Sequence, residues 1–228
     1  MKASIPRAAL FAVTAVHLLA LAVDWDLAAT ITKPLLMPLL AAYAWLAARP
    51  DRPRLLVAAV LCGWAGDVLL QFDVETAFLA GMGAFAAGHV CYQVLFAKGW
   101  RTRRAKIALI PYGIVWAAIL AVLWPGLGDL RVPVAFYSLL LAATAVVAVG
   151  ISTRAAVGGA LFLVSDTLIA FGIADLPRPP AVDVLIMATY VAGQYLLVTG
   201  APVMNRRAPA LTPSRHDVVT QPGTPPES

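Results

Sequence analysis

Residues 132–151 read VPVAFYSLLLAATAVVAVGI, an apolar run without a charged side chain. A helix needs about 20 mostly apolar residues to cross the hydrocarbon core of a bilayer. Further stretches of the same character occur at residues 5–23, 30–48, 55–72, 76–97, 107–124, 155–174 and 183–203. The sequence therefore predicts an all-α fold, a polytopic transmembrane helix bundle of about eight helices.

The overall composition supports a membrane protein. Of 228 residues, 61% are hydrophobic and 13% are charged, whereas a soluble domain has about 45–50% apolar and about 25% charged residues. Lipid must therefore cover most of the outside. The net charge of +5 comes from short basic clusters between the apolar runs, as in juxtamembrane loops, and we expect no nucleic-acid partner.

The placement of the basic residues predicts the orientation. When alternate loops are assigned to alternate sides with the N-terminus inside, 14 of the 17 Lys and Arg residues fall inside the cell. Only Lys33, Arg131 and Arg178 fall outside. This distribution follows the positive-inside rule. We expect both termini on the cytoplasmic side.

The two ends of the chain differ from the bundle. The first 23 residues also resemble a secretory signal peptide, with Lys2 and Arg7 before an apolar core and Ala20-Leu21-Ala22 as a cleavage site; cleavage would leave seven helices. Residues 205–228 are rich in Pro, Ser, Thr and Arg. We expect a transmembrane bundle over residues 1–204 and a disordered cytoplasmic tail over 205–228.

Two short motifs indicate an internal repeat. Gly66-Asp67-Val68-Leu69-Leu70 resembles Ser165-Asp166-Thr167-Leu168-Ile169, which lies 99 positions later. Two halves of four helices each would be parallel repeats, related by an axis along the membrane normal. Chance similarity between Leu- and Ala-rich helices is the alternative explanation.

The same motifs contain the candidate catalytic residues. Of twelve acidic residues, only Asp67 and Asp166 lie well inside predicted spans. A charged side chain at such depth costs several kcal/mol and usually marks function. At about 1.5 Å per residue, Asp67 is expected about 8 Å and Asp166 about 12 Å below the outer ends of parallel helices. They could share a site, or each could bond a hydroxyl to hold helices together.

Two other helices contribute polar and aromatic side chains. Phe78, Gly81, Phe85, His89 and Tyr92 follow helical spacing, so they lie on one face. Tyr190 and Gln194 lie one turn apart on another helix. These faces are candidate walls of a site, although aromatic stripes also serve simple packing.

The sequence gives little support for a metal or cofactor. Zinc enzymes usually present three protein ligands, and the predicted spans contain only His17 and His89, with no closely spaced ligand pair. Asp67, Asp166 and His89 together are the one set that could supply three ligands. We predict a metal-independent site and no cofactor.

The chain resembles the lysoplasmalogenase family of YhhN-like integral membrane proteins over roughly residues 5–203. The motifs that carry the resemblance are Thr32-Lys33-Pro34-Leu35-Leu36, Gly66 to Leu70, the face from Phe78 to Tyr92, Gly159 to Thr167, and Tyr190 with Gln194. The resemblance implies hydrolysis of the vinyl ether bond of lysoplasmalogens to a fatty aldehyde and a glycerophospho-alcohol, with Asp67 and Asp166 as the catalytic pair. The expected substrate-binding residues are Lys33, near the lipid phosphate, His89, Tyr92, Ser165, Tyr190 and Gln194.

Two carboxyl groups suit this chemistry. Vinyl ethers hydrolyse by protonation at carbon to an oxocarbenium ion, which water then captures. One neutral carboxylic acid can deliver the proton while a second carboxylate stabilises the cation and activates water, a division of labour similar to glycoside hydrolysis. The competing hypotheses are a proton- or cation-coupled transporter that uses the same aspartates, and a lipid-binding scaffold without turnover.

The expected partners are a lysophospholipid and the bilayer itself. The Ala-rich composition, in which Arg outnumbers Lys, is typical of a high-GC bacterium. We therefore expect the protein in the bacterial cell (inner) membrane.

Overall fold

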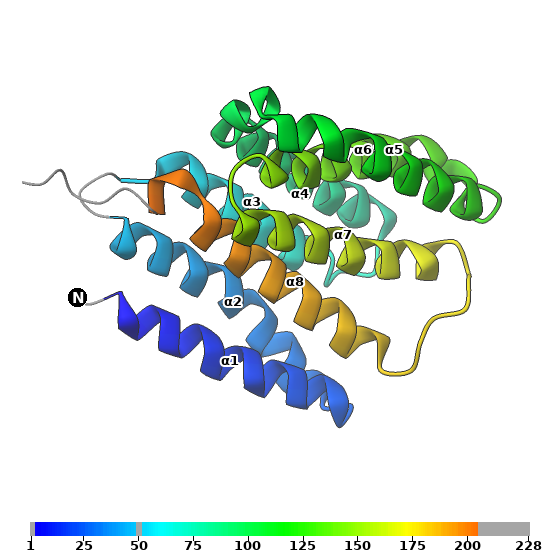
Figure 1. Cartoon of the computed structure of the whole chain (residues 1–228). Helices are drawn as coiled ribbons and strands as arrows, with labels where there is room; N and C mark the ends of the chain where they lie inside the picture. Colours follow the sequence, from blue (N-terminus) through cyan, green and yellow to red (C-terminus); the bar gives the residue numbers. More distant parts are fainter. Residues whose placement is uncertain (1–2, 49–51, 205–228) are drawn as a thin grey trace, which may run out of the picture.

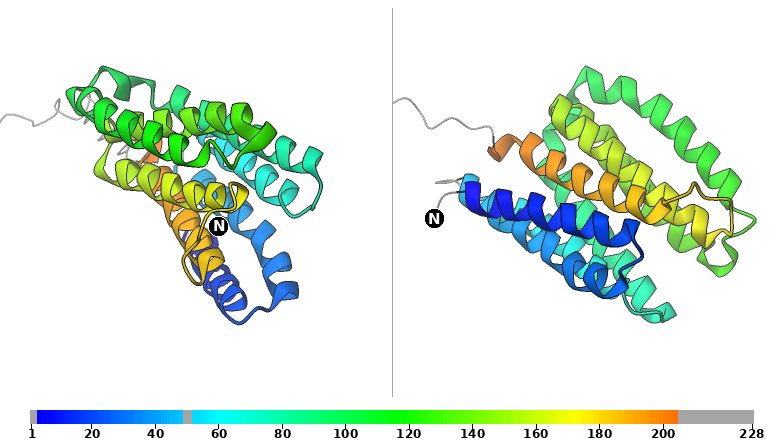
Figure 2. Two further views of the ribbon diagram at one scale, coloured as in Figure 1. Left: turned by 90° about the vertical axis from the view of Figure 1, so that its right-hand side faces the viewer. Right: turned by 90° about the horizontal axis from the view of Figure 1, so that it is seen from below.

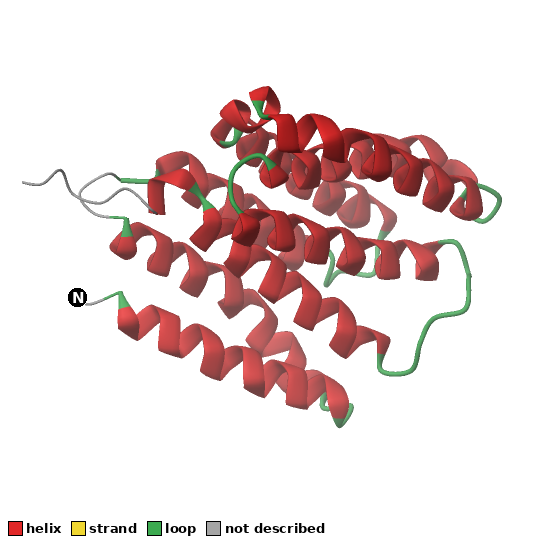
Figure 3. Cartoon of the chain, viewed as in Figure 1, coloured by secondary structure: helices red, strands yellow, loops and turns green. Residues whose placement is uncertain are grey.

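The computed structural model describes residues 3–48 and 52–204, and within these ranges it contains helices and no strand (Figure 3). The expected all-α bundle is confirmed, and the predicted tail at 205–228 lies outside the described residues. The α-helices are α1 (Ser4–Ala22), α2 (Asp26–Ala47), α3 (Arg54–Leu69), α4 (Glu75–Leu95), α5 (Arg103–Leu123), α6 (Arg131–Val149), α7 (Thr153–Ile173) and α8 (Val182–Gly200). Three short 3-10 segments are η1 (Ala97–Arg101), η2 (Gly128–Leu130) and η3 (Pro202–Met204).

Helix α3 is shorter than the sequence predicts. Seven helical segments of the described chain are long and apolar enough to cross a membrane, but α3 has only 16 residues. Sixteen residues extend about 24 Å, against about 30 Å of hydrocarbon. Because α3 ends at Leu69, Asp67 lies about 3 Å from its end, not the expected 8 Å. Asp166 lies about 10 Å from the end of α7, close to expectation.

The helices alternate in direction, so that α1 begins and α8 ends at the same end of the bundle (Figure 1). Within this arrangement α3 packs against α2 and α4, and α7 packs against α6 and α8. Helices α1 and α2 lie on one side of the bundle and α5 on the opposite side, as the further views confirm (Figure 2). This arrangement fits termini on one side of the membrane; which side is cytoplasmic stays a prediction.

Helix α2 continues through two prolines. It begins at Asp26, four residues earlier than predicted, so Pro34 and Pro38 both lie well inside the helix. Pro38 has no N–H for the carbonyl of Pro34. The indole Nε1 of Trp64, from α3, donates to this carbonyl at 2.9 Å. A side chain from a neighbouring helix therefore satisfies the backbone group that the proline frees.

Small residues bring the later helices into close contact. A Cβ atom on Gly193 of α8 would lie 3.0 Å from the carbonyl oxygen of Gly158 on α7. A Cβ atom on Gly159 would lie 2.8 Å from the Cα atom of Ala145 on α6. Such small residues are common where membrane helices pack backbone to backbone. They leave little space between the helices at the end of the bundle that holds the start of α1.

The buried apolar side chains form two clusters. The larger one joins α1–α4 to α6–α8 and includes Leu40, Leu56 and Phe162. The smaller one lies where α5 ends, where α6 begins and where α7 ends, and includes Leu123 and Val134. Side chains of both clusters line the candidate site.

Candidate active site

A cavity lies in the half of the bundle opposite the start of α1. The space between its walls, including the part that is open to the outside, is about 1020 Å³. Every helix from α2 to α8 contributes to the lining. Most lining side chains are apolar, and the polar and charged ones are Lys33, Asp67, Trp116, Tyr137, Ser138, Ser165, Asp166, Thr167 and Tyr190.

Asp67 reaches the cavity from the last turn of α3. Its side chain is only 4% exposed. The hydroxyl of Tyr190, from α8, donates to its Oδ2 at 2.7 Å. Its other oxygen has no hydrogen bond within the described chain and is not among the buried atoms without a partner, so it faces the cavity. Lys33 lines the same cavity, and its positive charge acts on the Asp67 carboxylate.

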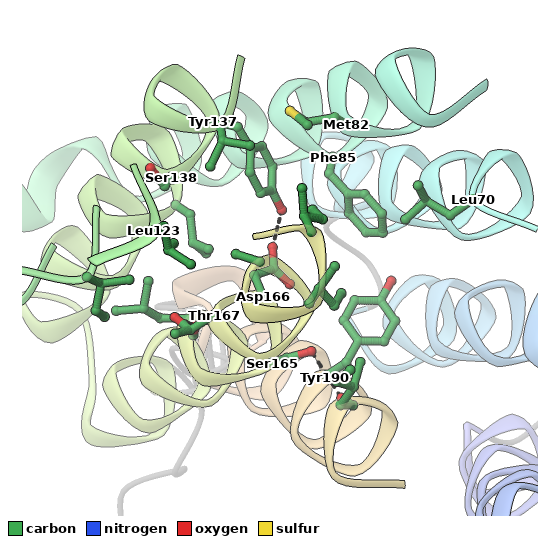
Figure 4. A pocket seen from close by; sticks show the side chains of 18 of the residues that line it. Leu70, Met82, Phe85, Leu123, Tyr137, Ser138, Ser165, Asp166, Thr167 and Tyr190 are labelled. Atoms are coloured by element: carbon green, nitrogen blue, oxygen red, sulfur yellow. Dashed lines mark hydrogen bonds between the residues drawn. The ribbon is translucent and has the colours of Figure 1, made fainter. Parts of the chain in front are cut away.

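Asp166 reaches the cavity from the middle of α7. The hydroxyl of Tyr137, from α6, donates a short hydrogen bond to its Oδ2 (Figure 4). The second oxygen of Asp166, like that of Asp67, is left without a bond to any described residue. The two carboxylates are close enough for their charges to interact. The cavity thus holds two acids, each held by one tyrosine and each with one oxygen available to a ligand.

Of the other predicted residues, Lys33, Ser165 and Tyr190 also line the cavity. The Ser165 hydroxyl donates to the carbonyl of Ile186 at 3.0 Å, which connects α7 to α8 beside the acids. Because its proton is engaged there, Ser165 presents only its oxygen to a ligand. The hydroxyl of Tyr190 likewise donates its hydrogen bond to Asp67.

The remaining predicted residues, His89, Tyr92 and Gln194, do not line the cavity. They lie beneath it, where the Tyr92 hydroxyl donates to Gln194 Oε1 at 2.6 Å. Both residues are buried, and their hydrogen bond connects α4 to α8. These positions place the three residues behind the cavity wall, and their part in substrate binding stays a prediction.

His89 is enclosed by aromatic rings. The centroid of its ring lies 4.8 Å from that of Phe162 and 5.8 Å from that of Tyr137, both edge to face. Neither of its ring nitrogens has a hydrogen-bond partner among the described residues. The contacts of His89 are thus with aromatic rings, and one of these rings is that of Tyr137, whose hydroxyl bonds Asp166.

The predicted face of α4 is thus divided between two environments. Phe78 and Phe85, toward the start of the helix, line the cavity, whereas His89 and Tyr92 are buried below it. The helical spacing correctly predicts that these residues share an inward face, but it does not give the depth at which the cavity ends.

Three lining residues were missed in the sequence. Tyr137 and Ser138 lie within the apolar run 132–151, and Trp116 donates to Ser138 Oγ at 3.0 Å. The adjacent Tyr and Ser in an otherwise aliphatic span were the available signal, because a hydroxyl at such depth needs a partner. Their partners could not be identified without the packing of α5, α6 and α7.

The described residues contain no group of three or more His, Cys, Asp or Glu side chains that could hold a metal ion. The ligand set considered above, Asp67 and Asp166 with His89, is not brought together, because His89 lies beneath Tyr137 outside the cavity wall.

The sequence of the chain is similar to those of known proteins. The chain is 33% identical over 157 residues to a lysoplasmalogenase of Mycobacterium tuberculosis (strain CDC 1551 / Oshkosh), which covers 64% of this chain and 60% of the relative. It is 31% identical over 177 residues to human lysoplasmalogenase TMEM86B, covering 76% of this chain and 75% of the relative. The chain thus spans about 60% of the length of its mycobacterial relatives. No solved structure gives a significant match.

A family model described as the YhhN family matches residues 28–201, which include helices α3 to α8 entire and both aspartates. That match covers well over half of the chain, and the apolar helices described above are those of an integral membrane protein. The chain belongs to the YhhN family.

Proposed function

We propose that this protein is a membrane-embedded hydrolase that cleaves the vinyl ether bond of lysoplasmalogen-type lysophospholipids. The products are a fatty aldehyde and a glycerophospho-alcohol. The observation that carries the proposal is the pair of carboxyl groups on one apolar cavity, each with one oxygen free of the protein. Membership of the YhhN family and the relatives named lysoplasmalogenase support it.

In the proposed reaction, Asp67 and Asp166 act as an acid and its charged partner. One carboxyl group, in its protonated form, gives its proton to the vinyl carbon that is remote from the ether oxygen. The other carboxylate stabilises the oxocarbenium ion and takes a proton from the attacking water. The resulting hemiacetal then collapses to the aldehyde and the alcohol. Tyr190 and Tyr137 would fix the orientation of the two carboxyl groups through their hydrogen bonds.

The substrate would enter as a single-chain lipid from the bilayer. Lys33 is the cationic group in the cavity wall, and we assign it to the lipid phosphate. The apolar lining suits the hydrocarbon chain. We further propose that the protein resides in the bacterial inner membrane with the cavity in the outer half.

The proposed mechanism uses no metal ion, because Asp67 and Asp166 alone supply the acid and the charged partner. Activity should therefore survive prolonged treatment with a chelator. Loss of activity on chelation, with recovery on adding zinc, would replace the acid–base mechanism by a metal-assisted one.

The deciding experiment is aldehyde release by the purified protein from a panel of lysolipids. We expect release from 1-alkenyl lysophospholipids and none from 1-alkyl ether lysophospholipids of equal chain length, which lack the protonatable double bond. No release from any vinyl ether lipid would contradict the proposal. Proton or cation flux in proteoliposomes would then favour the transporter hypothesis.

The chemical step gives a second test. Activity should fall at alkaline pH as the acid loses its proton, and at acidic pH as its partner becomes protonated; the two limits belong to the pair. Turnover should also be slower in deuterium oxide, compared on the plateau of the pH profile, because proton transfer to carbon is slow. A rate independent of pH while the protein stays folded would contradict the paired-carboxylate mechanism.

A further inference from the structure

The cavity has chemically different ends. At one end lies Lys33 on α2, whose ammonium has no hydrogen-bond partner among the described residues. At the other end, where α5, α6 and α7 meet, the wall is formed by Ile119, Leu120, Leu123, Val134, Ala170 and Ile173. We call this end the apolar arm. Helices α2 and α5 lie on opposite sides of the bundle (Figures 1 and 2).

The few polar groups near the apolar arm are already satisfied by the protein. Trp116 donates to Ser138, Ser138 donates to the carbonyl of Ala135, and Thr167 donates to the carbonyl of Leu163. Satisfied donors offer little to a phosphate, which needs charge or free N–H and O–H groups. A lipid headgroup is therefore favoured at Lys33, and a hydrocarbon chain is favoured in the apolar arm.

The two aspartates lie in a defined order between these ends. The charge of Lys33 acts on Asp67, and α2 packs against α3, which carries Asp67. Asp166 is held by Tyr137 of α6, and the next turns of α7 form part of the apolar arm. In Figure 4, Asp166 lies between Leu123 on the side of the apolar arm and Tyr190 on the side of Asp67. The order across the cavity is Lys33, Asp67, Asp166, apolar arm.

The covalent order of the substrate matches this sequence of groups. From the phosphate, a lysoplasmalogen continues through glycerol to the ether oxygen, then to the oxygen-bearing vinyl carbon, then to the second vinyl carbon and the chain. Water must attack the oxygen-bearing carbon, and the proton must reach the second carbon. On the proposed function, we infer that Asp166 is the proton donor to the second vinyl carbon and Asp67 the carboxylate beside the oxygen-bearing carbon.

The complete cycle balances with these roles. Asp166 transfers its proton to carbon, which leaves an oxocarbenium ion beside ionised Asp67. Water adds to the oxygen-bearing carbon and gives a proton to Asp67. Asp67 returns this proton to the ether oxygen as the carbon–oxygen bond breaks, while the hemiacetal hydroxyl proton passes to Asp166. The products leave with both aspartates in their starting states.

Binding of a stable cation tests the assignment without turnover. In a 1-alkylamino lysophospholipid, a secondary ammonium replaces the ether oxygen and carries the charge of the oxocarbenium ion. The 1-alkyl ether of equal length is its neutral control. We expect the wild-type protein to prefer the amine, and Asp67→Asn to reduce this preference by about tenfold or more. Asp166→Asn should retain it. Affinities can be measured by calorimetry in detergent micelles.

The results separate the assignment from the proposed function. A preference lost in Asp166→Asn and kept in Asp67→Asn would reverse the roles. Equal loss in both variants, or no loss in either, would overturn the assignment. In each case aldehyde release by the wild type would leave the proposed function standing, whereas its absence would remove that function.

A second measurement tests the position of the chain in a protein that keeps both acids. Leu123→Trp would fill part of the apolar arm, so KM should rise roughly tenfold for a long-chain vinyl ether and little for a short-chain one. The neighbouring Val122, 58% exposed on the lipid-facing surface, gives the control Val122→Trp, with no change expected. An equal effect on both chain lengths, or none, would show that the chain lies elsewhere and overturn the assignment.

Discussion

The two halves of the bundle are built for different tasks. The cavity half, which contains the loops 70–74 and 174–181, holds a few charged and polar side chains in a mostly apolar wall around open space. The terminal half, which contains the start of α1 and the end of α8, is closely packed through Gly158, Gly159 and Gly193. Most helices run through both halves, so each helix changes character along its length.

This difference separates catalysis from stability. In the cavity half, carboxyl groups keep oxygens free of the protein, which favours ligand contact over packing. In the terminal half, backbones approach closely at these glycines, and the Tyr92 hydroxyl and Gln194 Oε1 are buried and bonded to each other. Changes in the cavity half should affect turnover, and changes in the terminal half should affect folding.

The largest expected effect is the all-or-none behaviour of topology reporters. Alkaline phosphatase fused after Asp73 or Arg178, in the loops of the cavity half, should be active because the placement of the basic residues predicts that these loops face outside. Fusions after Trp100, in η1, should be inactive. Activity after Trp100 would place the cavity half on the cytoplasmic side.

The next largest effect concerns the two acids. Asp67→Asn and Asp166→Asn should each lower turnover by at least about 10²-fold, the scale of lost acid–base catalysis. Protein yield and melting temperature in detergent should change little. Asp183→Asn, at the exposed start of α8, is the matched control and should retain activity. Near-normal turnover in either variant would remove that aspartate from the site.

In the terminal half, Gly193→Val should lower the stability of the protein and leave its turnover nearly unchanged. A Cβ atom at Gly193 would lie 3.0 Å from backbone atoms of Gly158 and Phe162, so overpacking should cost about 1–3 kcal/mol or more. That corresponds to roughly 2–4 °C in melting temperature per kcal/mol, while turnover per folded molecule should change little. Gly113→Val, at a position where an added Cβ atom would meet no neighbouring helix within 4 Å, is the control. Equal losses of stability in both variants would mean that close packing is not the cause.

A smaller effect is expected at Lys33. Lys33→Gln removes the charge that we assign to the lipid phosphate, so KM should rise about tenfold while kcat stays within a few-fold. The control is an alkenylglycerol without a phosphate, whose KM should be the same in both proteins. An equal rise in KM for this lipid would argue that Lys33 acts on the fold of α2 instead.

The smallest effect is expected at the connection between α3 and α2. Trp64→Phe removes the hydrogen bond to the carbonyl of Pro34, worth about 1 kcal/mol, and should loosen the segment that carries Lys33. KM should rise a few-fold, and this rise should vanish in the Lys33→Gln background. Trp45→Phe, near the other end of α2, should have no effect. Additive effects in the double variant would separate Trp64 from Lys33.

Several features could be predicted from the sequence because the bilayer imposes simple rules. Span length, apolar content and charge placement follow from local composition, which predicted the helices within a few residues. The cost of a charge in hydrocarbon singled out Asp67 and Asp166 from twelve acidic residues. Both line the cavity, although their part in catalysis remains a proposal.

Other features depended on contacts between distant residues. The tyrosine partners come from α8 for Asp67 and from α6 for Asp166. In an exact repeat of four helices, α4 would correspond to α8, so the tyrosine partner of Asp166 would come from α4. It comes from α6, and the predicted repeat therefore does not account for these contacts. Likewise, helical spacing placed His89 on an inward face but gave no depth for the cavity floor.

The sequence by itself thus determined the membrane class, the approximate helices and the two acids within the spans, because each follows from the local balance between apolar burial and charge. Only the tertiary structure decided the early end of α3, the bond from Trp64 to the proline-freed carbonyl of α2, and the tyrosine that holds each aspartate. These features depend on which helices are neighbours and how closely they approach. Packing between segments that are far apart in the chain sets how closely the helices approach, and no local sequence pattern specifies this distance.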